Sequence, residues 1–266
     1  MAILRWIVIV MAGLLIASCA TMQSRVGHET KQALAPTGKL RVAFVMVLIS
    51  ATKDPTTGEL RGVSIDLGKE LAGRIGVPFE AIPYSTFPAL IGGAKSGEWD
   101  VAFAGINPER AAAIDFSAPF MEVEVGYLVR AGVPAVSMAE VDRPGIRVGV
   151  LEKAPSDIHL SATLKNATLV RSKTADDLYA MLGAGKADVI STGKTGLFSV
   201  AAKVPGSRVL DGRIFADPIG IGVPKGRNAS AAAYVDKFVD EAKAGGLVRA
   251  AIDSAQLRGV VPAAPK

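Results

Sequence analysis

The sequence is poor in the residues that most enzymes use for chemistry. Among 266 residues there is one cysteine, Cys19, and there are two histidines, His28 and His159. One cysteine cannot form a disulfide within the chain. No His/Cys/Asp/Glu group has the spacing of a metal site, and no glycine-rich loop has the dinucleotide-binding pattern. We therefore predict no catalytic residue, no metal and no cofactor.

Aromatic residues and charge runs are also scarce. Aromatics make up 6% of the chain, while half of it is hydrophobic, which is typical of a globular protein. The formal charge of +5 comes from 30 basic and 25 acidic side chains. Because the basic residues are scattered, without a run or an aromatic-interleaved patch, nucleic-acid binding is not indicated.

The N-terminus has the pattern of an export signal. A short basic start precedes the apolar run at 6–18, which has the length of a signal-peptide core and is too short to span a bilayer comfortably. The segment "IASC" ends the run at Cys19 and resembles a bacterial lipobox, in which the cysteine is acylated after cleavage. We predict a signal peptide at 1–18 and a lipidated flexible tether at 19–37, with no later membrane span. The alternative is ordinary cleavage after Ala20.

The body of the chain repeats one pattern twice. Strand-like and helix-like segments alternate at 40–47, 64–76, 77–84, 87–97 and 98–106, and again at 146–151, 156–165, 167–172, 175–185 and 187–192. Such β-α-β-α-β order indicates parallel sheets with crossover helices. A strand at 219–226 and a long amphipathic helix at 230–252 follow.

Two such units predict two α/β lobes, with the chain passing twice from one lobe to the other. We place lobe 1 at 38–129 and 216–258, lobe 2 at 130–215, and a disordered tail at 259–266. Two crossings form a hinge with a ligand cleft between the lobes. Ligands of open α/β sheets bind beyond the carboxyl ends of the strands, so residues just after each strand are the candidates.

One of these positions carries a positive charge where a helix disfavours it. The strand that ends at Gly105 and Ile106 leads into Asn107, a good N-cap, and then places Arg110 in the first helical turn, where cations are disfavoured. A ligand carboxylate bound to the guanidinium would account for this placement. The alternative is a surface arginine paired with Glu109, Asp115 or another neighbouring acid.

Three segments resemble the bacterial extracellular solute-binding proteins of family 3. These are "GELRGVSIDLGKELAGRIGV", "SGEWDVAFAGINPERAAAIDFSAPF" and "GKADVI", and "PERAAAIDFSAPF" is the most specific part. The resemblance runs from about Gly38 to Gly246. It implies the type II periplasmic-binding-protein fold, two α/β lobes with the first discontinuous, and a role in ABC import of polar amino acids. It also implies that Arg110 binds the ligand's α-carboxylate.

The chain departs from the family pattern elsewhere. The hydroxyl-bearing turn before the Pro-Glu-Arg element is reduced to "GIN", and Lys153 and Ala154 stand where lobe 2 usually has a Gly-Ser/Thr pair. In the family pattern an aspartate that binds the α-ammonium group stands where this chain has Gly193, so we predict a ligand with a carboxylate that is not an ordinary α-amino acid. Asp157, or an acid that the sequence does not locate, could replace that aspartate; Asp157 could equally cap its helix.

Three further segments are candidates for the wall of the cleft. Ser64 precedes a predicted helix, and Tyr84 ends a predicted strand. A structural role is at least as well supported for each of them. The run "VMVLIS" after the first strand is aliphatic where the family often has an aromatic lid. It indicates either an apolar pocket or a different register.

Taken together, these features predict a monomeric, exported solute-binding protein for a small carboxylate-bearing, amino-acid-like ligand, in the periplasm or cell envelope. Its partner would be an ABC permease in the inner membrane. One alternative is an exported dehydratase-like enzyme on the same fold, with Glu152, Asp157 or Asp217 as proton donor. The other is a ligand-sensing subunit for a membrane receptor.

Overall fold

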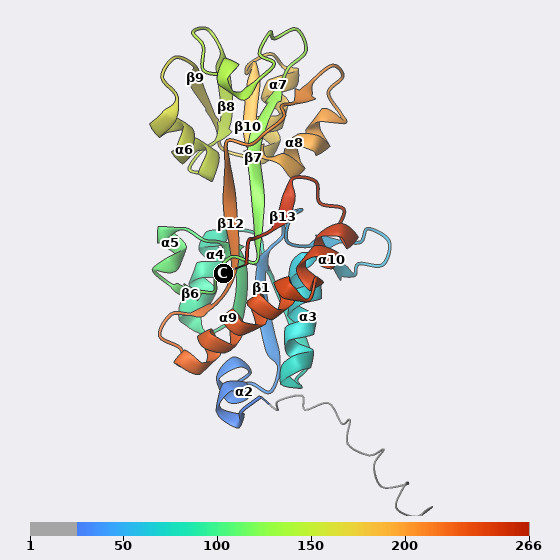
Figure 1. Cartoon of the computed structure of the whole chain (residues 1–266), viewed down its shortest axis with the longest axis vertical. Helices are drawn as coiled ribbons and strands as arrows, with labels where there is room; N and C mark the ends of the chain where they lie inside the picture. Colours follow the sequence, from blue (N-terminus) through green and yellow to red (C-terminus); the bar gives the residue numbers. More distant parts are fainter. Residues whose placement is uncertain (1–25, 266) are drawn as a thin grey trace, which may run out of the picture.

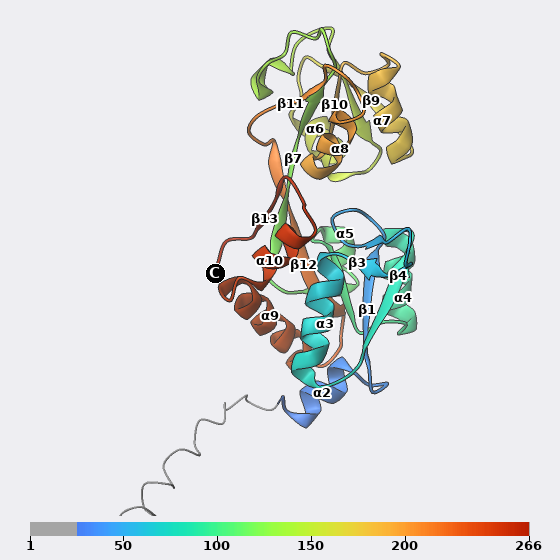
Figure 2. The ribbon, with the colours of Figure 1, turned by 90° about the vertical axis from the view of Figure 1, so that its right-hand side faces the viewer.

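The structure of the protein, a computed structural model, describes residues 26–265. The predicted signal peptide, Cys19 and the first part of the predicted tether lie outside the described residues. The chain forms two lobes stacked along the longest axis and connected by two long strands (Figures 1 and 2). No helix within the described range is long and apolar enough to cross a bilayer.

Lobe 1 is built on three parallel strands with helices on both faces. Strand β1 (Leu40–Val45) lies between β4 (Phe79–Tyr84) and β5 (Val101–Gly105). Its other elements from this half of the chain are β2 (Thr52–Lys53), β3 (Leu60–Arg61), α3 (Val63–Ile75), α4 (Phe87–Ser96), α5 (Pro108–Ala111) and β6 (Ile114–Phe116). Helix α3 ends at Gly76, whose φ of 67° is left-handed, as the sequence predicts.

Lobe 2 repeats this plan. Strand β8 (Arg147–Leu151) lies between β9 (Thr168–Ser172) and β10 (Val189–Gly193), and all three are parallel. The remaining elements are the 3₁₀ turn η1 (Met138–Glu140), α6 (Pro155–Thr163), α7 (Ala175–Gly183), α8 (Lys194–Ala201) and β11 (Arg208–Val209).

The two crossing strands are β7 (Met121–Val129) and β12 (Phe215–Pro224), which pair with each other antiparallel. They join both lobes into one sheet of order β4-β1-β5-β12-β7-β10-β8-β9. Because β12 is antiparallel to β5 and β7 is antiparallel to β10, the carboxyl ends of the parallel strands in each lobe point toward the other lobe. We call the carboxyl ends of β1, β4 and β5 the interlobe edge of lobe 1.

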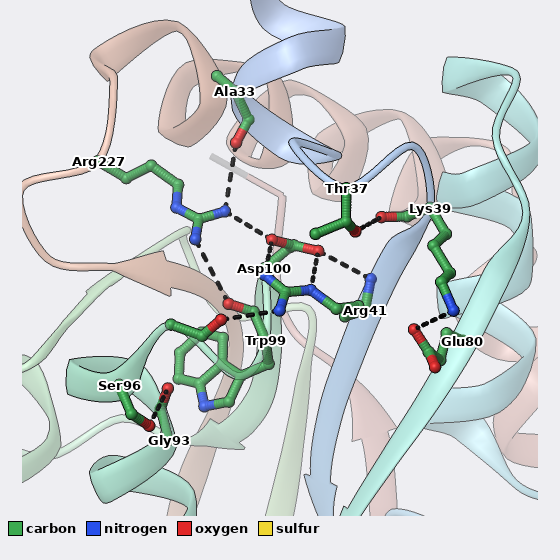
Figure 3. A network of polar contacts seen from close by, with 11 residues as sticks. Ala33, Thr37, Lys39, Arg41, Glu80, Gly93, Ser96, Trp99, Asp100 and Arg227 are labelled. Carbon is green, nitrogen blue, oxygen red and sulfur yellow. Dashed lines mark hydrogen bonds and ion pairs between the residues drawn. The ribbon is translucent and has the colours of Figure 1, made fainter.

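The repeat extends to the ion pairs that fasten each sheet. In lobe 1, the carboxylate of Asp100 accepts hydrogen bonds from the backbone N–H and guanidinium of Arg41 and from Arg227 (Figure 3). In lobe 2, Asp188 accepts the same set from Arg147 and one more from Arg130. The matching Asp-Val segments of the sequence therefore occupy equivalent places in the two lobes.

The long helix predicted at 230–252 is two helices. Helix α9 (Ala229–Ala244) ends before Gly245, and α10 (Leu247–Ser254) begins after Gly246, whose φ is 75°. A left-handed residue cannot continue a right-handed helix, so the chain turns there. The apolar stripe of α9 is confirmed, with Val235, Phe238, Val239 and Ala242 buried.

Both ends of the described chain are more ordered than the sequence indicates. Helix α2 (His28–Leu34) forms within the predicted tether, and Leu34 is fully buried in the main core of lobe 1. Strand β13 (Val260–Pro262) forms within the predicted tail and pairs with β7. The prediction of a tether to residue 37 and a tail from residue 259 is wrong for these two segments, because each finds a distant packing partner.

Candidate functional site

The candidate site lies where β5 ends at the interlobe edge of lobe 1. Asn107 is the N-cap of α5, as predicted, and its side-chain oxygen accepts a 2.9 Å hydrogen bond from the backbone N–H of Arg110. The expectation of free N–H groups in this turn is thus only partly met, because the cap occupies one of them. Helix α5 is a single turn, so the arginine side chain, rather than the helix end, is the group that matters for an anion.

Arg110 is held in place from two sides. Its Nη1 donates a 2.9 Å hydrogen bond to the carbonyl oxygen of Gly105, and its guanidinium carbon lies 3.6 Å from the centre of the Phe87 ring. Burial lowers the pKa of Arg110 from its ordinary value, although the group remains a cation at neutral pH. Within residues 26–265, its Nε and Nη2 have no hydrogen-bond partner. One edge of the guanidinium is therefore available for a two-point contact with a carboxylate.

The alternative pairing of Arg110 with a neighbouring acid is not found. In the described part of the chain, no carboxylate oxygen of Glu109 or Asp115 lies within 4.0 Å of a guanidinium nitrogen of Arg110. Asp115 is instead 3.4 Å from Lys225, on the antiparallel neighbour β12, and accepts a hydrogen bond from the backbone of Gly226. Among residues 26–265, no acid forms an ion pair with Arg110.

Gly105 is required by the position of the arginine. A Cβ atom on this residue would lie 2.7 Å from Nη1 of Arg110 and 3.6 Å from Oδ2 of Asp217. The absent side chain thus leaves a space that both charged groups border. The side chain of Ile106 contacts Gly220 of β12 and packs against the crossing strand.

Ser64 and Tyr84 are engaged within lobe 1. Ser64 is buried, and its hydroxyl shares a 2.7 Å hydrogen bond with the hydroxyl of Ser50. The Tyr84 hydroxyl donates a 2.7 Å hydrogen bond to Glu98, and burial together with this carboxylate raises the pKa of Tyr84. These contacts give each hydroxyl a structural role.

Asp157 is engaged by partners within lobe 2. It is buried near the start of α6 and accepts hydrogen bonds from the backbone N–H of Lys153, from Ser161 and from Arg171, at 2.9, 3.1 and 2.9 Å. The alternative that Asp157 caps its helix is wrong, because the N-cap of α6 is Ala154 and Asp157 lies within the first turn, from which it accepts the hydrogen bond of Lys153. Lys153, which replaces the expected glycine, has a φ of 60° and so adopts the left-handed conformation that glycine favours.

The aliphatic run after β1 is exposed at the interlobe edge. Met46, Val47 and Leu48 retain 37%, 38% and 49% of their accessible surface. Large apolar side chains exposed next to one another are typical of a surface that becomes covered by a partner or ligand. This observation favours the apolar wall over a shift of register.

Other features of the described chain lie away from this site. His159 packs on Phe215, with ring centroids 4.7 Å apart, so its role is contact between α6 and β12. A cavity of about 300 Å³ lies in lobe 2 between β9 and α7 and contains none of the predicted site residues. No group of three or more His, Cys, Asp or Glu side chains within 26–265 could hold a metal ion.

Sequence reasoning missed the part played by Phe87 and named Asp217 only as an alternative proton donor. Phe87 opens α4 directly after Thr86, whose hydroxyl caps that helix. Its position just beyond β4 was the available signal, because residues after parallel strands line such sites. Asp217 lies on a crossing strand, and no local pattern places it beside Arg110.

Comparisons with known proteins give the family of this chain. Residues 47–254 match the bacterial extracellular solute-binding proteins, family 3. The ABC transporter glutamine-binding protein of Bacillus subtilis is 26% identical over 67% of this chain and 67% of its own length. The glutamine-binding protein of Geobacillus stearothermophilus is 26% identical over 76% of this chain and 79% of its own length.

A solved structure shows the same fold. The ancestral amino-acid-binding protein AncCDT-1, a precursor of cyclohexadienyl dehydratase, superposes with a TM-score of 0.68 at 24% identity, covering 86% of this chain and 100% of its own. Its two-lobed fold matches the architecture described above. Since the family match spans most of the sequence, the chain belongs to the bacterial extracellular solute-binding proteins of family 3.

Proposed function

We propose that this protein is the substrate-binding component of an ABC-type importer and captures a small, amino-acid-like solute through its carboxylate. The observation that carries the proposal is Arg110, which is braced by Phe87 and Gly105 and keeps its Nε–Nη2 edge without a partner in the described chain. Relatives of similar length are glutamine-binding proteins of ABC transporters, which supports both the import role and the ligand class.

In this mechanism the ligand first binds to lobe 1. Its carboxylate takes the free edge of Arg110, and lobe 2 then closes by bending β7 and β12, the two strands that join the lobes. The ligand shifts the equilibrium toward the closed form only by as much as it binds that form more tightly. The closed form is then the one that docks on the permease.

The test is a thermal-shift screen of residues 20–266 with amino acids, keto acids, dicarboxylates and aromatic acids. A ligand at about 100 times its Kd should add roughly 2.7 kcal/mol of stability, a shift of several degrees for a protein of this size. Arg110→Ala should abolish the shift. Arg110→Lys keeps the positive charge but should still weaken binding, because lysine cannot make the planar two-point contact. Unchanged affinity in Arg110→Lys would contradict the proposed two-point contact between Arg110 and the ligand carboxylate.

The second candidate is a dehydratase-like activity on the same site. It is favoured by the similarity to a precursor of cyclohexadienyl dehydratase and by the acid Asp217 beside Arg110. We propose that binding without turnover is the function, since the curated relatives are glutamine-binding proteins. Incubation with prephenate distinguishes the two: release of carbon dioxide that Asp217→Asn abolishes would establish the enzyme.

The location follows from the family and from the N-terminus. Extracellular solute-binding proteins act outside the cytoplasm. We propose that Cys19 carries the lipid that retains this chain at the membrane. Labelled palmitate should enter the wild-type protein and not Cys19→Ala, whereas ordinary cleavage after Ala20 would leave both unlabelled.

A further inference from the structure

Asp217 lies beside Arg110 at the point where the chain returns from lobe 2. It is in β12, paired with Val123 of β7, and two residues before Ile219, which pairs with Gly105. It therefore stands just beyond the carboxyl end of β5. Its Oδ2 and Nη1 of Arg110 lie 3.6 and 2.7 Å from the same point, the place of the missing Cβ of Gly105.

The carboxylate of Asp217 is partly shielded from water and has no protein partner among the described residues. It is half-buried and forms no hydrogen bond or ion pair with any residue in the range 26–265, although the field of Arg110 reaches it. Burial raises the pKa of Asp217, and the nearby Arg110 opposes that rise. A carboxylate that loses water without gaining a donor is costly unless something else supplies one.

Other acids near the interlobe space are already occupied or fully hydrated. Asp157 accepts three hydrogen bonds within lobe 2. Glu109 and Glu152 are exposed, so water satisfies them. Gly193 offers no carboxylate at the place where the family pattern has one. Asp217 is thus the acid whose position and lack of partners fit a cation.

The ligand chemistry follows from the two charges together. An anion acceptor and a cation acceptor border one small space without forming an ion pair within 4.0 Å of each other. In an α-amino acid, the carboxylate and the ammonium group are attached to a single carbon, so the two charges lie close together with opposite signs. Such a molecule would satisfy both side chains through charge-assisted hydrogen bonds.

We propose that Asp217 binds the α-ammonium group of an α-amino acid whose carboxylate is bound by Arg110. The inference rests on the proposed function and deepens it. This places the ammonium contact on β12, one of the two strands that cross between the lobes. Recognition of the whole zwitterion then takes place on lobe 1 and the hinge before lobe 2 closes.

The experiment compares matched ligands by titration calorimetry on residues 20–266. The probes are the twenty common L-amino acids and, for each that binds, the same acid with hydrogen in place of the α-ammonium group. The wild type should prefer the amino acid by about 10- to 100-fold, the range for a hydrogen bond between charged groups. Asp217→Asn should remove most of that preference, and Asp217→Ser should do the same.

Two controls separate this inference from the proposed function. Asp211→Asn removes an equal charge from an exposed position in the same segment and should keep the full preference. Arg110→Gln should weaken the amino acid and its deaminated counterpart alike. Thermal unfolding of Asp217→Asn without ligand should start at or above the wild-type temperature, because the lost carboxylate had no partner.

Each outcome decides one claim. The role of Asp217 is overturned if Asp217→Asn keeps the preference for the amino acid, or if the wild type binds carboxylates but no amino acid. Either result leaves the proposed contact between Arg110 and the ligand carboxylate intact. If the wild type binds neither the amino acids nor their deaminated counterparts, the Arg110–carboxylate contact and the proposed function are overturned together with the role of Asp217.

Discussion

The guanidinium of Arg110 lies over the ring of Phe87, 3.6 Å from guanidinium carbon to ring centre. Both residues belong to helices that follow parallel strands, Phe87 to α4 after β4 and Arg110 to α5 after β5. The stack restricts the long arginine side chain before any ligand arrives, which lowers the entropy lost on binding. We therefore expect the Phe87 ring to support the proposed ligand site by holding Arg110, without a contact of its own to the ligand's charged groups.

Phe87→Leu should weaken ligand binding by roughly 3- to 30-fold, since a cation–π contact is worth about 0.5 to 2 kcal/mol. Calorimetry with the ligand found in the screen measures this. Phe238→Leu is the matched control, because Phe238 also lies under an arginine, Arg74 at 5.0 Å, but in the core of lobe 1. It should lower stability and leave affinity unchanged; equal losses of affinity in both variants would contradict the role given to Phe87.

Gly105→Ala should separate binding from stability. Gly105 is in β5 without a positive φ, so alanine suits its backbone, but the new methyl would lie 2.7 Å from Nη1 of Arg110. The arginine must move, and we expect at least a tenfold loss of affinity with a change of stability below about 1 kcal/mol.

Gly73→Ala is the control for this substitution. Gly73 lies inside α3 with nothing within 4 Å of its Cβ position, so alanine should stabilise the helix slightly and leave binding intact. Unaltered affinity in Gly105→Ala would mean that the arginine does not need its observed position.

The sequence was sufficient for the features that depend on neighbours in the chain. The order of strands and helices, the left-handed Gly76 and the cap formed by Asn107 all follow from local patterns, and the structure confirms them. The break at Gly246 was also visible locally, as a Gly-Gly pair, but the continuous apolar stripe on either side of it outweighed that signal.

Features that depend on distant partners could not be predicted in this way. Helix α2 is held by Leu34 in a core whose other side is α9, and β13 is held by backbone pairing with β7. Neither segment has the length or periodicity to form by itself. The same reason hid the approach of Asp217 to Arg110, which are brought together only when β12 pairs with β5.

Asp100→Asn should be among the most damaging single changes in lobe 1. The carboxylate is fully buried and lies 2.8 Å from both Arg41 and Arg227, the second of which also reaches the carbonyl oxygen of Ala33 in α2 (Figure 3). Removing one partner from a buried ion pair costs about 3 kcal/mol or more. Urea denaturation should show this loss, and a variant within 1 kcal/mol of the wild type would contradict it.

The equivalent aspartate of lobe 2 gives a prediction about acid. The hydrogen bonds from Arg147, together with Arg130, hold the pKa of Asp188 far below its ordinary range. A depressed pKa in the folded state contributes stability above the unfolded value of about 3.9, and this contribution is lost as the pH falls toward the folded value.

Between pH 5 and pH 2, then, the wild type should lose stability more steeply than Asp188→Asn, which has no proton to bind at this site. Denaturation midpoints across that range measure the two slopes. Asp211→Asn, which removes the same charge from an exposed loop, is the control and should follow the wild type. Parallel slopes for wild type and Asp188→Asn would contradict the assignment.

The C-terminal segment should contribute to stability and should connect the lobes. Strand β13 pairs with β7, and the carbonyl oxygen of Gly259 accepts a 2.8 Å hydrogen bond from Glu124. Arg258 reaches lobe 2: its carbonyl oxygen accepts a 2.8 Å hydrogen bond from Thr195 of α8, and its guanidinium carbon lies 3.6 Å from the centre of the Phe198 ring. The segment thus forms a third connection beside β7 and β12.

A chain that ends at Leu257 should therefore lose roughly 2 to 4 kcal/mol, from the missing burial of Val260 and the lost hydrogen bonds, and should melt about 4 to 16 °C lower. Thermal and urea unfolding measure the loss. A chain that ends at Ala264 is the control, because Pro265 is exposed and its removal leaves β13 intact. If both truncations unfold like the full chain, residues 258–264 do not stabilise the protein. Arg258→Ala alone should cost less than the truncation, since it leaves the β13 pairing and the backbone hydrogen bond to Thr195 in place.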